Sequence, residues 1–71
     1  MFMKIVVNGE HQEAEEPFTV TQLLQKLNLR SDQVAVEINL KIVDRGDFPT
    51  WNLHDGDTVE ILSFIGGGSP A

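Results

Sequence analysis

MKIVVNGEHQE at residues 3–13 is the stretch that decides the fold. Its first five residues alternate between two faces, with Met3, Ile5 and Val7 on one of them, which is typical of a strand with one buried side. The dipeptide Asn8-Gly9 comes next, and it favours the positive φ angles of a two-residue hairpin turn. The chain is therefore predicted to open with a β-hairpin.

The second strand of this hairpin, residues 10–15, is almost entirely polar. The two-residue turn sets Val7 opposite Glu10 and Lys4 opposite Glu13, so Lys4 and Glu13 are expected to form a cross-strand ion pair. A strand this polar has no face to bury, and we expect it at an edge of the sheet.

A helix is predicted over residues 20–27. Thr19-Val20-Thr21-Gln22 has the form of a capping box, in which Thr19 caps the first turn and Gln22 reaches back to the backbone of Thr19. Four apolar residues at positions 20, 23, 24 and 27 fall on one stripe, and the remaining positions are polar. Asn28 is the expected stop. The helix therefore has one face to bury.

Three further strands are predicted in the second half of the chain. Residues 34–38 alternate in polarity, Asn39-Leu40 turns the chain into a short strand at 41–43, and residues 58–64 alternate again. Residues 44–54 are rich in turn formers and are expected to cross irregularly, with Phe48 and Trp51 filling the core. Asp55-Gly56-Asp57 is predicted to be a tight turn.

This order of elements predicts an α+β fold of the β-grasp type. A helix after the hairpin covers one face of a mixed sheet of four to five strands, and a right-handed crossover lets the last strand lie beside the first. Residues 1–65 are predicted to form the β-grasp domain. Residues 66–71 are predicted to be a flexible tail rich in glycine.

Composition excludes several classes of function. Five basic and eleven acidic residues among 71 give a net charge of −6, which argues against nucleic-acid binding and favours a basic protein partner. The absence of cysteine excludes disulfides, zinc–thiolate sites and a thiol nucleophile of its own. No apolar run approaches a membrane span or a signal peptide, so we expect no membrane partner and a cytoplasmic protein.

The titratable side chains do not form a recognisable catalytic or metal-binding motif. His11 and His54 are expected to be ordinary surface residues, because no third ligand has suitable spacing. Six carboxylates are predicted to be solvated charge, or else to steer a basic partner: Glu10, Glu13, Glu15, Glu16, Asp55 and Asp57. A domain of this size also has little room for an internal pocket.

The end of the chain carries the chemistry. Phe64-Ile65 is followed by Gly66-Gly67-Gly68, and three successive glycines are costly to hold in a regular element. A thread extended from Phe64 to Gly68 reaches about 13 Å, which is enough to enter an enzyme's active site. The apolar side chains of Phe64 and Ile65 are expected either to dock a partner or to be buried in the core.

Taken in order, these motifs resemble the ubiquitin-like MoaD-ThiS family, and within it the ThiS sulfur carriers of thiamine biosynthesis. The resemblance covers residues 3–68, and it depends on the order and spacing of motifs that are each common alone. The motifs are Asn8-Gly9, Thr19-Val20-Thr21-Gln22-Leu23-Leu24, Val34-Ala35-Val36-Glu37-Ile38-Asn39, Asp55-Gly56-Asp57-Thr58-Val59-Glu60-Ile61 and Phe64-Ile65-Gly66-Gly67-Gly68. The chain departs from the family in one respect, because family members usually end at the glycine, whereas Ser69-Pro70-Ala71 follows here.

The resemblance implies a protein co-substrate that is not itself an enzyme and binds no cofactor. It implies that a ThiF-like adenylyltransferase uses ATP to adenylate the terminal glycine, that a persulfide donor such as a cysteine desulfurase supplies sulfur, and that the thiocarboxylate passes sulfur to the thiazole synthase ThiG. By this resemblance Gly68 is the acceptor once residues 69–71 are removed. Gly67 precedes it in the terminal glycine pair and is the less favoured alternative acceptor. Phe64, Ile65 and Gly66 are the expected partner-binding residues.

Two alternatives stay open at this stage. A molybdopterin-type sulfur carrier has the same fold and glycine end, but it tends to be longer and to approach the glycines through a proline that Phe64-Ile65 lacks. A β-grasp interaction module without terminal chemistry would use residues 66–71 merely as a linker or a disordered end.

Overall fold

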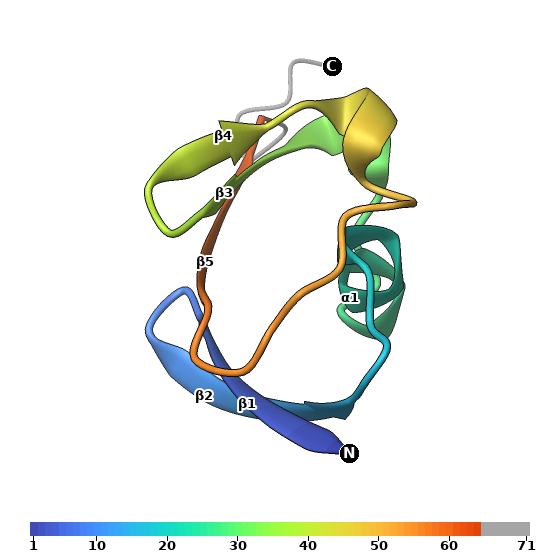
Figure 1. Ribbon diagram of the computed structural model, residues 1–71. Helices are drawn as coiled ribbons and strands as arrows, with labels where there is room; N and C mark the ends of the chain where they lie inside the picture. Colours follow the sequence, from blue (N-terminus) through green and yellow to red (C-terminus); the bar gives the residue numbers. More distant parts are fainter. Residues whose placement is uncertain (65–71) are drawn as a thin grey trace.

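Five strands form one mixed sheet in the computed structural model, which describes residues 1–64 (Figure 1). The strands are β1 (Phe2–Val7), β2 (Glu10–Glu15), β3 (Val34–Ile38), β4 (Lys41–Val43) and β5 (Thr58–Ser63). Their order is β2-β1-β5-β3-β4, with β1 and β5 parallel and the other neighbours antiparallel. The helix α1 (Val20–Lys26) packs on one face, and the short 3-10 helices η1 (Ser31–Gln33) and η2 (Arg45–Asp47) lie in the connections. The predicted β-grasp fold is confirmed, with the last strand beside the first.

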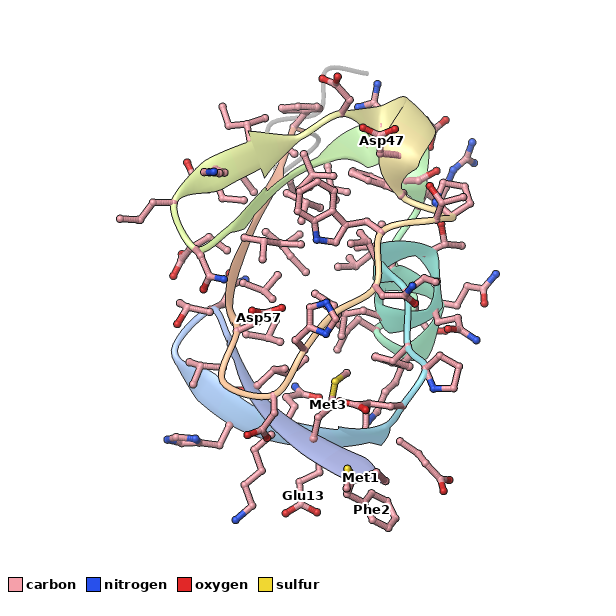
Figure 2. All side chains as sticks on the ribbon, in the orientation of Figure 1. Met1, Phe2, Met3, Glu13, Asp47 and Asp57 are labelled. Atoms are coloured by element: carbon pink, nitrogen blue, oxygen red, sulfur yellow. The ribbon has the colours of Figure 1, made fainter. Side chains whose placement is uncertain are left out.

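The β1–β2 hairpin has the predicted register. Val7 pairs with Glu10 and Lys4 with Glu13, and β2 lies at an edge of the sheet. The turn residues Asn8 and Gly9 have φ angles of 50° and 84°. The predicted ion pair between Lys4 and Glu13 is wrong, because the two side chains do not come within salt-bridge distance. Both side chains are exposed, and Glu13 points into solvent in Figure 2, where an ion pair gains little over hydration.

Helix α1 starts at the predicted capping box. The Gln22 backbone N–H donates to Thr19 Oγ1 at 3.2 Å, and the Thr19 backbone N–H donates to Gln22 Oε1 at 2.8 Å. The helix ends one residue earlier than predicted, because Leu27 is its C-cap, and Asn28 then adopts a left-handed φ of 59°. No helix within residues 1–64 is long and apolar enough to cross a membrane.

The core lies between α1 and the inner face of the sheet. Alternate residues of each strand point inward, as Figure 2 shows for β1, where Met3 points to the interior and Phe2 away from it. Phe48 and Leu53, from the irregular crossing, are 2% and 1% exposed, and Trp51 is half-buried against the same cluster. The prediction that this crossing fills the core is confirmed.

Two turn asparagines hold the central strand β5. Asn8 pairs with the backbone of Ile61, accepting from its N–H at 2.7 Å and donating to its carbonyl at 3.2 Å. Asn39, in the β3–β4 turn, accepts from the Thr58 N–H at 3.0 Å and donates to Asp57 Oδ1 at 2.9 Å. The strand that leads towards Phe64 is therefore fixed from both sides.

Asp57 is not the solvated charge that was predicted. It is 9% exposed, and Figure 2 shows it pointing to the inner side of the molecule. Its second oxygen, Oδ2, accepts the His54 backbone N–H at 2.8 Å, in addition to the bond from Asn39. A carboxylate with two donors at these distances can be buried, because the donors replace its lost hydration.

Candidate partner-binding face

Phe64 is the predicted site residue that the structure describes. Its backbone N–H donates to the Gln33 carbonyl at 2.9 Å, but the regular strand ends at Ser63, one residue earlier than predicted. The Phe64 side chain is 64% exposed, so it does not belong to the core. Ile65, Gly66, Gly67 and Gly68 lie outside the described residues, and their roles stay predictions, as does the domain boundary at residue 65.

The face of β3, β4 and β5 that points away from α1 is called here the open face; it consists of Ala35, Glu37, Ile42, Thr58, Glu60 and Leu62. Within residues 1–64 no helix or strand packs over it (Figure 1). Ile42 is 74% exposed and Leu62 is 63% exposed. Ile42 and Leu62 lie on strands on either side of β3. Exposed aliphatic side chains on one sheet face are typical of a protein-interaction surface.

The strand register sets the pattern of this face. Ala35 lies opposite Leu62, while Glu37 lies opposite Ile42 on one side and Glu60 on the other. The open face therefore presents two adjacent carboxylates with aliphatic side chains beside them.

Hollows continue the open face at both ends of β3. One, of about 210 Å³, is bounded by Ala35, Ile42 and Phe64 among others, near the point where the chain leaves β5. The other, of about 410 Å³, lies beside Glu60 and Leu40. Leu40 is 89% exposed and has a φ of 73°, a left-handed conformation that is unfavourable for a bulky residue.

The titratable groups within residues 1–64 do not form a catalytic arrangement. In one exposed pair, a hydrogen bond from Arg30 to Asp32 lowers the pKa of the carboxyl, and the same bond raises the pKa of the guanidinium. In the same part of the chain no three metal-ligating side chains converge, and His11 and His54 are both exposed.

The sequence interpretation missed the aliphatic and acidic residues of the open face. The alternation that buries Val36 and Ile61 also turns Glu37, Glu60 and Leu62 outward, so their exposure could have been read from the same pattern. Their position beside one another depends on the β3–β5 register, which local pattern does not set.

Comparison with known proteins places the chain in a family. The model of the ThiS family matches residues 3–68. The crystal structure of a thiamine biosynthesis protein (ThiS) from Geobacter metallireducens superimposes with a TM-score of 0.78 at 38% identity, covering 93% of this chain and all of that one. The recognition made from the sequence motifs is confirmed.

Relatives by sequence are of two lengths. The Escherichia coli K12 protein called sulfur carrier protein ThiS is 32% identical over 66 residues, which are 93% of this chain and 100% of that protein. A thiazole synthase of Paramagnetospirillum magneticum is 46% identical over 67 residues, which are 94% of this chain and 21% of the synthase. The chain thus spans about a fifth of the length of the relatives named thiazole synthase. By family match, sequence and fold, this chain belongs to the ThiS family.

Proposed function

We propose that this protein is a sulfur carrier of thiamine biosynthesis, whose terminal glycine is adenylated and then converted to a thiocarboxylate. The observation that carries the proposal is the family match over residues 3–68, because it includes the three glycines as well as the domain. The names of the relatives and of the similar solved structure favour the thiamine pathway over a molybdopterin carrier.

The chemistry is that of activating a carboxylate. An oxygen of the Gly68 carboxylate attacks the α-phosphate of ATP and displaces pyrophosphate. The terminal sulfur of an enzyme persulfide attacks the carbonyl carbon of the resulting acyl-adenylate and displaces AMP. A thiol then attacks the enzyme-side sulfur of the resulting acyl disulfide, forms a disulfide with it, and releases the thiocarboxylate. Glycine suits this position because it has no Cβ, so the carboxylate can approach ATP through a narrow slot.

The catalytic groups for these steps belong to partner enzymes. A ThiF-like adenylyltransferase would use the ATP, a cysteine desulfurase would donate the persulfide sulfur, and the thiazole synthase ThiG would accept sulfur from the carrier. Support for the last partner comes from the relatives named thiazole synthase, which contain a region similar to this chain. The exposed Phe64 and the open face are the docking surface that this function needs, together with Ile65 and Gly66.

Intact-mass spectrometry tests the proposal. The chain ending at Gly68 is incubated with ATP, adenylyltransferase, a persulfide donor and a thiol, and it should gain the mass of one oxygen-to-sulfur exchange. The 71-residue chain should stay unmodified, because Pro70 restricts the backbone and Ala71 brings a Cβ to the reacting position.

A chain ending at Gly68 but carrying Gly68→Ala is the matched control, and we expect it to react much more slowly. Failure of the Gly68-ended chain to react with any such enzyme would favour the interaction-module alternative. Equal reaction of the alanine control would refute the glycine-slot argument.

A further inference from the structure

Two carboxylates face each other in the middle of the open face. Glu37 on β3 lies directly opposite Glu60 on β5. Two backbone hydrogen bonds show which facing residues of β3 and β5 are hydrogen-bonded pairs: Asn39 N–H donates to the Thr58 carbonyl at 2.8 Å, and Phe64 N–H donates to the Gln33 carbonyl at 2.9 Å. The glutamates occupy a hydrogen-bonded pair position, for which the Cα separation is about 5.5 Å. Like charges at this spacing disfavour the isolated protein.

The protein does not neutralise this pair with its own cations. Within residues 1–64 no Lys or Arg side chain lies within salt-bridge distance of either glutamate. Arg30 is held by Asp32, Arg45 donates to backbone carbonyls, and Lys26 donates to the Glu13 carbonyl. The two remaining lysines, Lys4 and Lys41, form no salt bridge within the described residues. A compensating charge would therefore come from another molecule.

The surroundings of the pair favour an arginine. Ile42 flanks Glu37 on the side away from Glu60, and Leu62 lies two residues beyond Glu60 on the same face. A guanidinium is planar, weakly hydrated and has five donors, so one group can bridge both carboxylates and lie against these aliphatic side chains. A lysine ammonium is a strongly hydrated point charge and fits such surroundings less well.

We propose that Glu37 and Glu60 bind an arginine side chain of thiazole synthase, with aliphatic contacts from Ile42 and Leu62 around it. The inference rests on the proposed function, because it names the chemistry by which the carrier docks. Two relatives named thiazole synthase carry a region similar to this chain, which makes the synthase the partner to which we assign the face. The same strand β5 carries Glu60, Leu62 and then the chain leading to Phe64, so docking here brings the chain end to that partner.

Calorimetric titration into thiazole synthase of the same organism tests the charge pair. Glu37→Gln and Glu60→Gln should each weaken binding of the full chain about tenfold or more, and should reduce its dependence on salt. Glu10→Gln and Glu13→Gln remove the same charge from exposed positions on β2 and are the matched controls, with affinity expected to stay within about twofold of wild type.

Arginine-specific chemical modification identifies the partner group. Thiazole synthase is treated with phenylglyoxal with and without the carrier, and its peptides are examined by mass spectrometry. Wild-type carrier should protect one synthase arginine, and the double variant carrying Glu37→Gln and Glu60→Gln, at saturating concentration, should not. Substituting that synthase arginine by lysine should weaken binding to the same extent as the glutamate variants.

The outcomes separate this inference from the proposed function. If wild-type carrier binds the synthase and the open-face glutamate variants bind equally well, the arginine site is wrong and the sulfur-carrier function stands. Protection of no arginine by bound wild-type carrier would overturn the site as well. If wild-type carrier does not bind the synthase at all, the assigned partner fails and the arginine site fails with it.

Discussion

Replacing the buried carboxylate of Asp57 is the sharpest test of how the central strand is held. Asp57→Ala removes the acceptor for the His54 backbone N–H at 2.8 Å and for Asn39 Nδ2 at 2.9 Å. A buried donor left without a partner costs about 1–3 kcal/mol. The bond from the His54 N–H is partly buried, and Asn39 is exposed, so its amide can bind water instead. We therefore expect a total loss of about 1–3 kcal/mol.

This loss is large for a domain of 71 residues. At roughly 0.05–0.15 kcal/mol per residue its whole stability is about 4–10 kcal/mol. A change of 1 kcal/mol shifts Tm by about 4–8 °C in domains of this size, so Asp57→Ala should lower Tm by about 4–24 °C. Asp57→Asn should lie between wild type and the alanine variant, since its amide can accept from one donor but presents an NH₂ group to the other.

Urea denaturation followed by tryptophan fluorescence measures the effect. Trp51 is the one tryptophan of the chain, and it is half-buried against the core, so its emission reports unfolding. Asp47→Ala is the matched control, because Asp47 is exposed and its carboxylate accepts no hydrogen bond within the described residues. If Asp57→Ala destabilises the protein no more than Asp47→Ala does, the conclusion that the hydrogen bonds of Asp57 to His54 and Asn39 stabilise the fold is refuted.

Further substitutions test the helix, the open face and the surface ion pair. Leu24→Ala removes a side chain that is 1% exposed and should destabilise the protein by about 2–5 kcal/mol in the same urea assay; a near-wild-type midpoint would contradict the core assignment. Thr19→Ala removes the capping hydroxyl and should lower stability by about 1 kcal/mol, whereas Thr19→Ser should retain it. Glu60→Gln should raise the stability of the isolated chain by up to about 1 kcal/mol, and a loss instead would argue against repulsion with the facing glutamate. Arg30→Gln should raise the pKa of Asp32 in an NMR titration. Because the pKa of Asp32 is lower in the folded protein than in the unfolded chain, the Arg30–Asp32 pair stabilises the fold at pH values above the unfolded pKa, and this stabilisation is lost as the pH falls through the folded pKa. The pair is exposed, so the variant should hardly change Tm at neutral pH.

Features set by neighbouring residues could be predicted from the sequence. The hairpin register follows from Asn8-Gly9, because a two-residue turn leaves only one pairing of β1 with β2. The start of α1 follows from Thr19 and Gln22, which satisfy each other's backbone within one turn.

Features set by distant residues could not be predicted in this way. The burial of Asp57 depends on Asn39, eighteen positions away, and the pairing of Glu37 with Glu60 depends on the β3–β5 register. Lys4 and Glu13 do lie opposite each other. An ion pair between them would lose hydration and side-chain entropy, and the size of this cost cannot be read from the residue types. Family resemblance supplied Gly67 and Gly68 as functional residues, and the mass-spectrometric experiment is their test.

The position of β5 has a mechanical consequence. The strand lies between β1 and β3, parallel to one and antiparallel to the other, and the chain leaves it towards the glycines. Hydrogen bonds in the antiparallel ladder are perpendicular to the strands, so a pull along β5 loads those bonds together in shear instead of breaking them one after another. A pull on the chain end along β5 would therefore act in the direction in which the domain resists extension best.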